Sequence, residues 1–197
     1  MTLIQDFRTA SGDWAFSTTD AGSRKTHQTL SGRKWYSMNL RCDPKRASQG
    51  LDESYVGCSN GFTDFQEFVE WHRSKIGYGQ GFQVDKDLLV KGNKVYSPTT
   101  CSLIPGRVNR FLTNSTSSSR SLPLGVVFDK ERRLYIANCS RAEGGNKFLG
   151  RFATPEDAFA AYKTFKEAAL KVLAEEWRDR LEPQYYEALI NFEITPY

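Results

Sequence analysis

Histidine and cysteine, the residues most often used as zinc ligands, general bases and nucleophiles, are few and widely spaced in this sequence. The chain of 197 residues has two histidines and four cysteines, and no two cysteines form a CxxC pair. These spacings argue against a structural zinc site. Free cysteines are mostly buried in proteins, so we expect reduced, packed thiols. The four positions are Cys42, Cys58, Cys101 and Cys139.

His72 falls within a stretch that predicts an amphipathic helix over residues 63–76. Thr63 and Gln66 form a capping-box pair at the start of this stretch. The apolar residues on the same side of the helix as the histidine are Phe65, Phe68, Val69 and Ile76. A catalytic or metal-binding role for His72 stays open, but its place among apolar residues favours a hydrogen-bonded core histidine.

A second stretch, between residues 33 and 46, interleaves aromatic and basic side chains. Aromatic rings beside cations can stack on nucleic acid bases and contact phosphates. Trp35, Met38 and Cys42 also recur at helical spacing, which is typical of a face packed in a core with the charges outside. The second interpretation is favoured for the aromatic residues.

Charge is concentrated in particular segments of the chain. The net charge of +4 is too small to indicate a polyanionic partner by itself. Residues 21–50 and 120–151 each carry seven Lys and Arg, against one and three acidic residues, whereas residues 155–193 are net acidic. The sequence has neither an apolar run of membrane-spanning length nor a signal-peptide pattern. We therefore expect no membrane partner and a cytoplasmic protein.

Composition divides the chain into four parts. Residues 1–30 are rich in Thr, Ser, Gly and Asp, which is typical of an extended arm. Residues 115–121 are small and polar and predict a linker. A first folded module is expected over residues 31–114 and a second over residues 122–197.

The second module carries three short β-like runs followed by a long helical pattern. The runs cover residues 124–129, 133–140 and 147–153. Thr154 is the expected N-cap of the helix, which extends to about Glu182, with Pro183 as its stop. The expected apolar face of this helix is Ala158, Ala161, Tyr162, Phe165, Ala169, Val172 and Leu173. The sequence thus predicts an α+β fold with a three-stranded antiparallel sheet packed on a long helix.

Short motifs in this module resemble those of the plant ethylene-response-factor (APETALA-type) DNA-binding domain, which also occurs beside nuclease modules in phage homing endonucleases. The motifs are Leu124-Gly125-Val126, Leu134-Tyr135-Ile136-Ala137, Phe148-Leu149-Gly150-Arg151-Phe152, Thr154-Pro155-Glu156-Asp157-Ala158 and Ala161-Tyr162. In that family the sheet enters the major groove, so the resemblance implies double-stranded DNA as the partner.

The resemblance also implies which side chains contact DNA. The base-facing positions are Asn138, Ser140, Asn146 and Phe148. The residues suited to phosphate contact are Lys130, Arg132, Arg133, Arg141, Lys147 and Arg151. Val127 and Asp129 stand where family members usually carry arginines on the first strand. A sheet-plus-helix unit with ordinary solvated charges, or with a protein-binding face, is the alternative.

Motifs in the middle of the chain resemble phage homing-endonuclease-like proteins, in which an HNH (ββα-metal) module precedes the groove-binding sheet. The motifs run over residues 82–90 and 91–98, and include Cys101, Ile104-Pro105 and Val108-Asn109. The resemblance implies that a strand presents Asp85, that a turn at Gly92 and Asn93 reverses the chain, and that a helix from about Pro105 returns Asn109. In this scheme Asp85, Asp87 and Asn109 would hold one Mg²⁺ or Mn²⁺ against the scissile phosphate.

The catalytic set implied by this resemblance is Asp85, Lys86, Asp87 and Asn93. The sequence departs from the family at Lys86, where nuclease members usually place a histidine that activates water. A lysine with an ordinary pKa of about 10.4 is protonated and cannot accept a proton. Asp87 could then act as the base, or Lys86 could bind phosphate. In the alternative, Asp85, Lys86 and Asp87 form a hydrogen-bonded turn in a degenerate module.

The sequence therefore predicts a phage-type DNA-binding protein, located in the host cell cytoplasm if phage-encoded. The expected function is metal-dependent nicking or cleavage of DNA by an enzyme of homing-endonuclease ancestry. The alternative is a catalytically inactive descendant that binds DNA as a regulator, or binds a host protein as a defence inhibitor. The pattern of Asp85, Asp87 and Asn93 favours the enzyme, whereas Lys86 and the scarcity of histidine favour the alternative.

Overall fold

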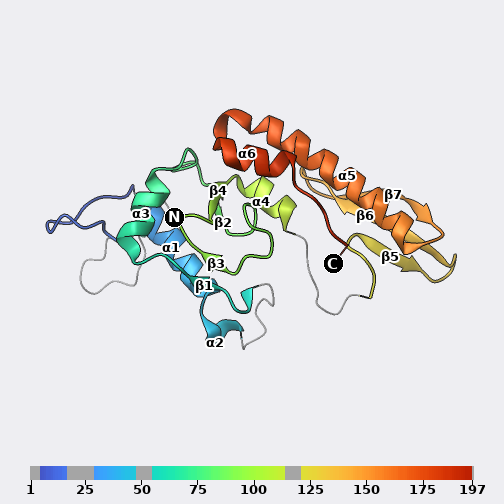
Figure 1. The fold of residues 1–197 in the computed structure, drawn as a ribbon, viewed down its shortest axis with the longest axis horizontal. Coiled ribbons are helices and arrows are strands. Elements are labelled where there is room, and N and C mark those ends of the chain that lie inside the picture. The colour runs from blue at the N-terminus through green and yellow to red at the C-terminus, as the bar shows by residue number, and fades with distance from the viewer. Residues whose placement is uncertain (1–4, 17–28, 48–54, 114–120, 197) are drawn as a thin grey trace. The chain divides into compact units, whose positions relative to one another are not determined.

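The computed structural model describes residues 5–16, 29–47, 55–113 and 121–196 (Figure 1). The chain divides into two compact units, Met1–Pro105 and Gly106–Tyr197. The composition predicts that the first module ends at residue 114, so the boundary falls nine residues earlier. The helix over Gly106–Leu112 therefore belongs to the second unit. Almost all of the expected linker, and more than half of the expected arm, lie outside the described residues.

The first unit combines three helices with two small two-stranded sheets among its described residues. In chain order the elements are α1 (Leu30–Arg41), α2 (Pro44–Ala47), β1 (Ser59–Asn60), α3 (Phe65–Arg73), β2 (Gln83–Asp85), β3 (Val95–Tyr96) and β4 (Ser102–Ile104). Strand β1 pairs with β3 in parallel, and β2 pairs with β4 antiparallel so that Asp85 lies opposite Ser102.

Aromatic side chains from α1 and α3 form much of the core of the first unit. The ring of Trp35 lies 5.4 Å from that of Phe68, centroid to centroid. Met38 and Phe68 are almost fully buried. Trp35 and Met38 of the aromatic and basic stretch therefore pack inward, as their helical spacing predicts.

Helix α3 is capped one residue later than the sequence predicts. Asp64, not Thr63, is the N-cap, and its Oδ1 accepts a hydrogen bond from Glu67 N at 2.9 Å. Glu67 Oε2 accepts in return from Thr63 N at 2.6 Å, so Glu67 takes the place expected for Gln66. The helix also ends early, which leaves Ile76 47% exposed and not on the buried face.

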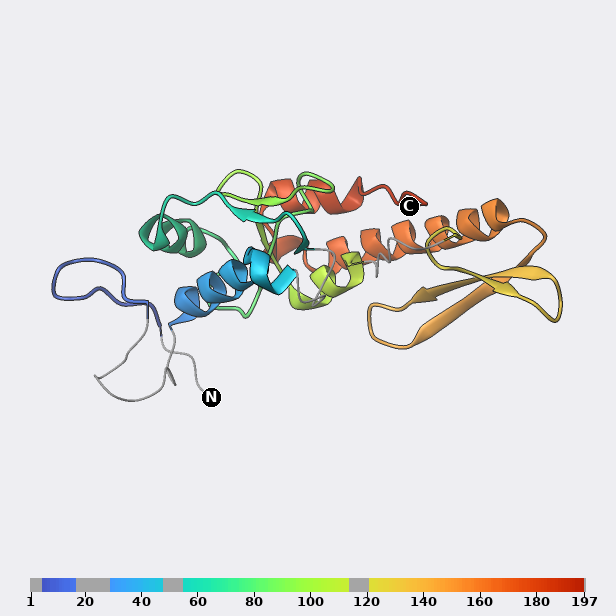
Figure 2. The same ribbon diagram turned by 90° about the horizontal axis from the view of Figure 1, so that it is seen from below.

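The second unit contains the predicted sheet and long helix. Its elements are α4 (Gly106–Leu112), β5 (Val126–Asp129), β6 (Leu134–Ser140), β7 (Asn146–Phe152), α5 (Pro155–Glu176), the 3₁₀ helix η2 (Arg178–Arg180) and α6 (Pro183–Ile190). The strands form one antiparallel sheet in the order β5-β6-β7. Helix α5 contacts all three strands and lies along one face of the sheet (Figure 2). The α+β class and the sheet-on-helix arrangement are thus confirmed.

Small side chains allow α5 to lie close to the sheet. Ala137 of β6 and Ala158 of α5 are both fully buried and share a cluster with Val126. Gly125 has a positive φ of 73°, and a Cβ atom there would lie only 2.0 Å from the ring of Tyr162. A side chain at Gly125 would therefore force Tyr162 and α5 away from the start of β5.

The start of α5 is as predicted, but its end is not. Thr154 Oγ1 accepts a hydrogen bond from Asp157 N at 3.1 Å, which caps the helix. Pro183 does not terminate α5, because it is the first residue of a further helix, α6. The buried face of α5 includes Leu170, whereas Val172 is 69% exposed.

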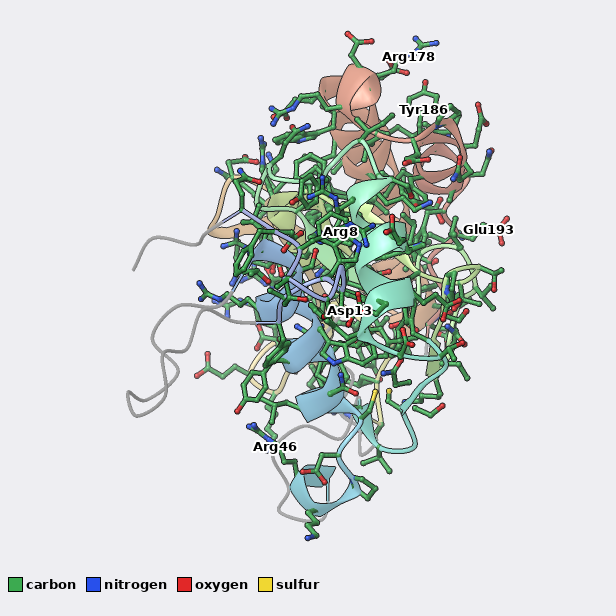
Figure 3. All side chains as sticks on the ribbon, turned by 90° about the vertical axis from the view of Figure 1, so that its left-hand side faces the viewer. Arg8, Asp13, Arg46, Arg178, Tyr186 and Glu193 are labelled. Carbon is green, nitrogen blue, oxygen red and sulfur yellow. The ribbon has the colours of Figure 1, made fainter. Side chains whose placement is uncertain are left out.

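Helix α6 packs on α5 and extends the core of the second unit. Tyr185 and Leu189 of α6 are each 1% exposed. At the exposed end of this helical pair, the Arg178 guanidinium lies 5.1 Å from the ring centroid of Tyr186 (Figure 3). None of the helices in the described ranges is long and apolar enough to cross a membrane.

Candidate nucleic-acid interface and the Asp85 turn

The strand register places the four predicted base-facing side chains on one face of the sheet. Asn138 pairs with Phe148, and Ser140 pairs with Asn146. The alternate residues of β6, Ala137 and Cys139, are buried at 0% and 1% exposure on the side of α5. Because successive strand residues point to opposite faces, Asn138 and its companions point away from α5. We call this surface the open face; it comprises Val127, Ile136, Asn138, Ser140, Asn146, Phe148 and Arg151.

The open face exposes both apolar and polar groups. The side chains of Val127 and Phe148 are large and apolar, yet these residues are 56% and 51% exposed. Ser140 Oγ donates a long hydrogen bond of 3.4 Å to Asn146 Oδ1. The backbone N–H of Asn138 donates to Gly125 O at 2.8 Å, but the side-chain amide of Asn138 makes no hydrogen bond with any group that the structure describes. This face therefore has unused hydrogen-bonding capacity beside exposed apolar surface.

Asp129 engages two of the six predicted phosphate-contacting residues. Its Oδ2 lies 3.3 Å from Arg132 Nη1 and 3.6 Å from Arg151 Nε. The hydrogen bond from the Arg132 backbone N–H, together with the Arg132 side chain, holds the pKa of the Asp129 carboxyl below its ordinary value. Asp129 thus partly neutralises the positive charge at this end of the sheet.

The other four basic residues have no acidic partner within the described chain. They are Lys130, Arg133, Arg141 and Lys147, and all four are exposed. Arg133 lies in the β5–β6 turn with a φ of 53°, and Arg141 begins the β6–β7 turn. Three of these charges therefore lie in the turns at the two ends of β6, whereas Lys147 pairs with Cys139 and so points to the side of α5.

The carboxylate of Asp85 is used by the turn that follows β2. Its Oδ1 accepts hydrogen bonds from Asp87 N at 2.9 Å and from Leu88 N at 2.7 Å. Burial raises the pKa of the Asp85 carboxyl, and the neighbouring charge of Asp87 adds to this rise, while the two N–H donors oppose it. Asp85 therefore stabilises a local turn in the manner of a cap.

Lys86, Asp87 and Asn93 complete a hydrogen-bonded network around this turn. Lys86 is only 4% exposed, and its Nζ lies 2.6 Å from Asp87 Oδ2. Asn93 Nδ2 donates to the carbonyl oxygens of Lys86 at 2.9 Å and Val95 at 2.6 Å. Asn93 Oδ1 accepts from Val95 N at 3.0 Å. The amide of Asn93 is fully engaged with the backbone.

This arrangement does not fit a divalent cation as it stands. The ammonium of Lys86 already occupies the position beside Asp87 that a cation would take. Asn109, the third ligand implied by the HNH resemblance, belongs to α4 in the second unit. Within the described residues, no group of three or more His, Cys, Asp or Glu side chains is placed to hold a metal ion.

His72 belongs to a buried polar network whose other members the sequence did not reveal. Ser31 donates its hydroxyl proton to Asp6 Oδ2 at 2.5 Å, and its Oγ lies 2.7 Å from His72 Nδ1. Because that proton is already used, His72 Nδ1 must donate to Ser31 Oγ. Tyr78 also donates to Asp6 Oδ2, at 2.8 Å. Burial lowers the pKa of His72 to about 4, which keeps the ring neutral.

Burial also makes the thiols of the first unit unreactive, because it disfavours the charged thiolate. Cys58 and Cys101 are buried, Cys42 is partly buried, and none forms a disulfide. Burial raises the pKa of Cys42 to about 11 and that of Cys101 to about 12. These cysteines are therefore packed thiols and not thiolate nucleophiles.

Comparisons with protein-family profiles, with curated proteins and with solved structures find no match for this chain.

Proposed function

We propose that the protein binds double-stranded DNA through the open face of the β5–β6–β7 sheet. The observation that carries this proposal is the strand register, which gathers Asn138, Ser140, Asn146 and Phe148 on the face turned away from α5. A twisted antiparallel ribbon fits a major groove about 12 Å wide, and several β-sheet proteins read DNA in this way.

The chemistry of the open face suits contact with base edges. The free amide of Asn138 can pair with the N6 and N7 atoms of adenine, and the Phe148 ring can contact a thymine methyl group. Good pairs of this kind discriminate between bases by about 1–3 kcal/mol. Val127 offers only apolar contact and Asp129 is already ion-paired, so the first strand adds little to base readout.

Phosphate contacts then supply most of the affinity. The exposed cations Lys130, Arg133 and Arg141 of the two turns can neutralise phosphates on both sides of the groove, whereas Lys147 pairs with Cys139 and points to the side of α5. Arg132 and Arg151 contribute less because Asp129 shares their charge. Binding is therefore strongly dependent on salt and only modestly selective for sequence.

The most direct test measures binding of a fluorescent duplex to the full chain at about 50 mM salt. Phe148→Ala should weaken binding, because it removes the largest exposed ring on the open face. Asp129→Asn should strengthen binding, because it releases Arg132 and Arg151. Val172→Ala removes an exposed apolar side chain from α5 and is the matched control. Absence of binding, or equal effects of Phe148→Ala and Val172→Ala, would refute the proposal.

For the first unit, we favour a non-cleaving role, in which the protein acts as a DNA-binding regulator or as an inhibitor of a host protein. In support of this role, Asp85 and Asn93 hydrogen-bond the backbone of their own turn, and Lys86 forms an ion pair with Asp87. The rival is a Mg²⁺- or Mn²⁺-dependent nuclease, which the adjacent carboxylates of Asp85 and Asp87 favour.

A plasmid nicking assay with Mg²⁺ and with Mn²⁺ separates the two roles. We expect no nicking by the wild-type protein. The Lys86→His variant restores the residue type usual in nucleases, and it should remain inactive because Asp85 and Asn93 stay bonded to the backbone. Metal-dependent nicking by the wild type that Asp85→Asn abolishes would establish the nuclease instead.

A further inference from the structure

The second unit contains a cavity of about 1370 Å³ that extends beyond the proposed DNA-contact positions to α4 and α5. It is bounded by α4, the start of β5, the β6–β7 turn and the middle of α5. Its charged lining residues are Arg107, Arg110, Arg141, Glu143 and Lys166. Four cations and one acid line it, and although Arg107 is paired with Glu176 outside this lining, the site keeps a net positive charge.

Lys166 is the unusual member of this set. It lies in the middle of α5 and is only 3% exposed. Its Nζ is 4.0 Å from the ring centroid of Phe111 on α4, and within the described chain it has neither a hydrogen bond nor an ion pair. Burial lowers the pKa of Lys166, and Cys139 opposes this shift. A buried ammonium without a counter-charge is unfavourable.

Two arginines of α4 extend the same positive surface. Arg107 Nη1 pairs with Glu176 at 2.6 Å, but its buried Nε has no hydrogen-bond partner among the described residues. Arg110 is exposed and lies three residues further along, which brings the two guanidinium groups to one side of the helix. The donors around the cavity thus exceed the acceptors that the described chain offers them.

We infer that this cavity binds a phosphate group, with Lys166 at its base and Arg110 and Arg141 at its rim. A phosphate supplies the missing negative charge and accepts several hydrogen bonds at once. The cavity is larger than the about 300–1000 Å³ of typical small-molecule pockets, which favours a polymer backbone over a free metabolite.

The position of the cavity also favours a DNA backbone as the source of the phosphate. Asn138, Ser140 and Asn146 of the open face line the same cavity. A strand lying across these residues would carry its phosphates past Arg141 toward α4. The inference therefore rests on the proposed DNA-binding function and adds a phosphate site at one end of the binding surface.

The test compares Lys166→Met with Lys171→Met in the full chain. Both substitutions remove one positive charge from α5, but Lys171 is exposed and does not line the cavity. Lys166→Met should weaken duplex binding and lower the magnitude of the salt slope by about one. It should also leave the unfolding temperature unchanged or raise it, because a buried unpaired charge is lost. Lys171→Met should change neither quantity appreciably.

Arg110→Gln provides a second variant that should not disturb folding, because the side chain is exposed. It should weaken duplex binding and lower the salt slope in the same way as Lys166→Met. Inorganic phosphate and a deoxynucleoside monophosphate are titrated separately, with thermal stability as the readout, to distinguish a free phosphate from the DNA backbone.

The outcomes separate this inference from the DNA-binding proposal. Should the duplex bind while Lys166→Met and Arg110→Gln retain wild-type affinity and salt slope, the phosphate site is wrong and the binding face stands. If the duplex does not bind, but inorganic phosphate stabilises the wild type and not Lys166→Met, the site takes free phosphate and the DNA-binding proposal fails. If Lys166→Met alters the response to neither duplex nor phosphate, the inference is overturned.

Discussion

Polar side chains around Asp85 and polar side chains on the open face differ in what they bond to. Asp85 and Asn93 direct their oxygens and amide groups to the backbone of their own turn, and Lys86 is held by Asp87. On the open face, by contrast, the side-chain amide of Asn138 makes no hydrogen bond with the described residues, and half of Phe148 is exposed.

This difference shows that a residue type suited to catalysis indicates function less well than a side chain whose hydrogen-bonding groups the fold leaves unused. Asp85, Lys86 and Asn93 are all suited to chemistry, yet the fold consumes their hydrogen bonds. The amide at Asn138 is chemically ordinary, but it remains available to a ligand. Substitutions in the first region should therefore change stability, and those in the second should change binding.

The largest expected effect is a loss of folding stability on acidification, caused by His72 in the buried polar network of the first unit. The pKa of His72 is lowered from 6.5 to about 4 by burial, opposed by Asp6 and assisted by Lys34 and Arg73. Between these values the unfolded chain binds a proton that the folded unit does not. The stabilisation is therefore complete above pH 6.5 and is lost as the pH falls toward 4, by up to about 3 kcal/mol.

Urea unfolding at a series of pH values from 7 to about 4 measures this loss. The control is His72→Asn, because an asparagine amide can still donate to Ser31 but does not titrate. The variant should lose much of the pH dependence. Identical pH dependence in the wild type and in His72→Asn would contradict the assignment.

The next largest effect is the difference in unfolding free energy between two substitutions at Asp85. Asp85→Ala leaves two backbone N–H groups without their acceptor and should lower the free energy of unfolding by about 1–3 kcal/mol. Asp85→Asn keeps an oxygen acceptor and should be much closer to wild type. Neither change should alter duplex affinity. An increase in stability for Asp85→Ala would point instead to relieved repulsion between the carboxylates of a metal site.

The opposite pattern is expected for Asn138→Ala on the open face. Its unfolding free energy should stay within about 0.5 kcal/mol of wild type, as for most surface substitutions. Its binding to a duplex that contains the preferred base should weaken by about 1–3 kcal/mol. Thermal unfolding and anisotropy titration on the same preparation measure both. A large loss of stability without a loss of binding would erase the contrast between the two regions.

The smallest effect concerns the phosphate contacts proposed for Arg133 and Lys130 in the β5–β6 turn. Arg133 has a positive φ, so Arg133→Gly removes the charge without backbone strain. Combined with Lys130→Ala, it should weaken binding to all duplex sequences alike and lower the magnitude of the salt slope by about two. A sequence-dependent loss would show that these side chains contact bases.

Local signals in the sequence predict the second unit well. Alternation and turn residues locate all three strands within two residues of their ends, and Thr154 with Pro155 marks the start of α5. The end of α5 is missed because Pro183 is equally compatible with stopping one helix and starting the next. The burial of Lys166 is also missed, although its spacing from Tyr162 and Leu170 places it on the core face.

The first unit is less predictable because its polar networks join distant residues. Ser31 and His72 are 41 residues apart, and Asp6 is 25 residues from Ser31. No local pattern links such positions. The hydrogen-bonded turn at Asp85, Lys86 and Asp87 is foreseen as an alternative, but only the bond partners of Asn93 and Lys86 favour it over a metal site.

Chemical-shift mapping by NMR gives the most direct test of the central claim that the open face binds DNA. A short duplex is added to the full isotope-labelled chain at low salt, and the perturbed amide and side-chain signals are assigned. We predict that the shifts concentrate on β6 and β7, include the Asn138 and Asn146 side-chain amides, and fade as salt is added. Shifts confined to the first unit, or no shifts at all, would contradict the account.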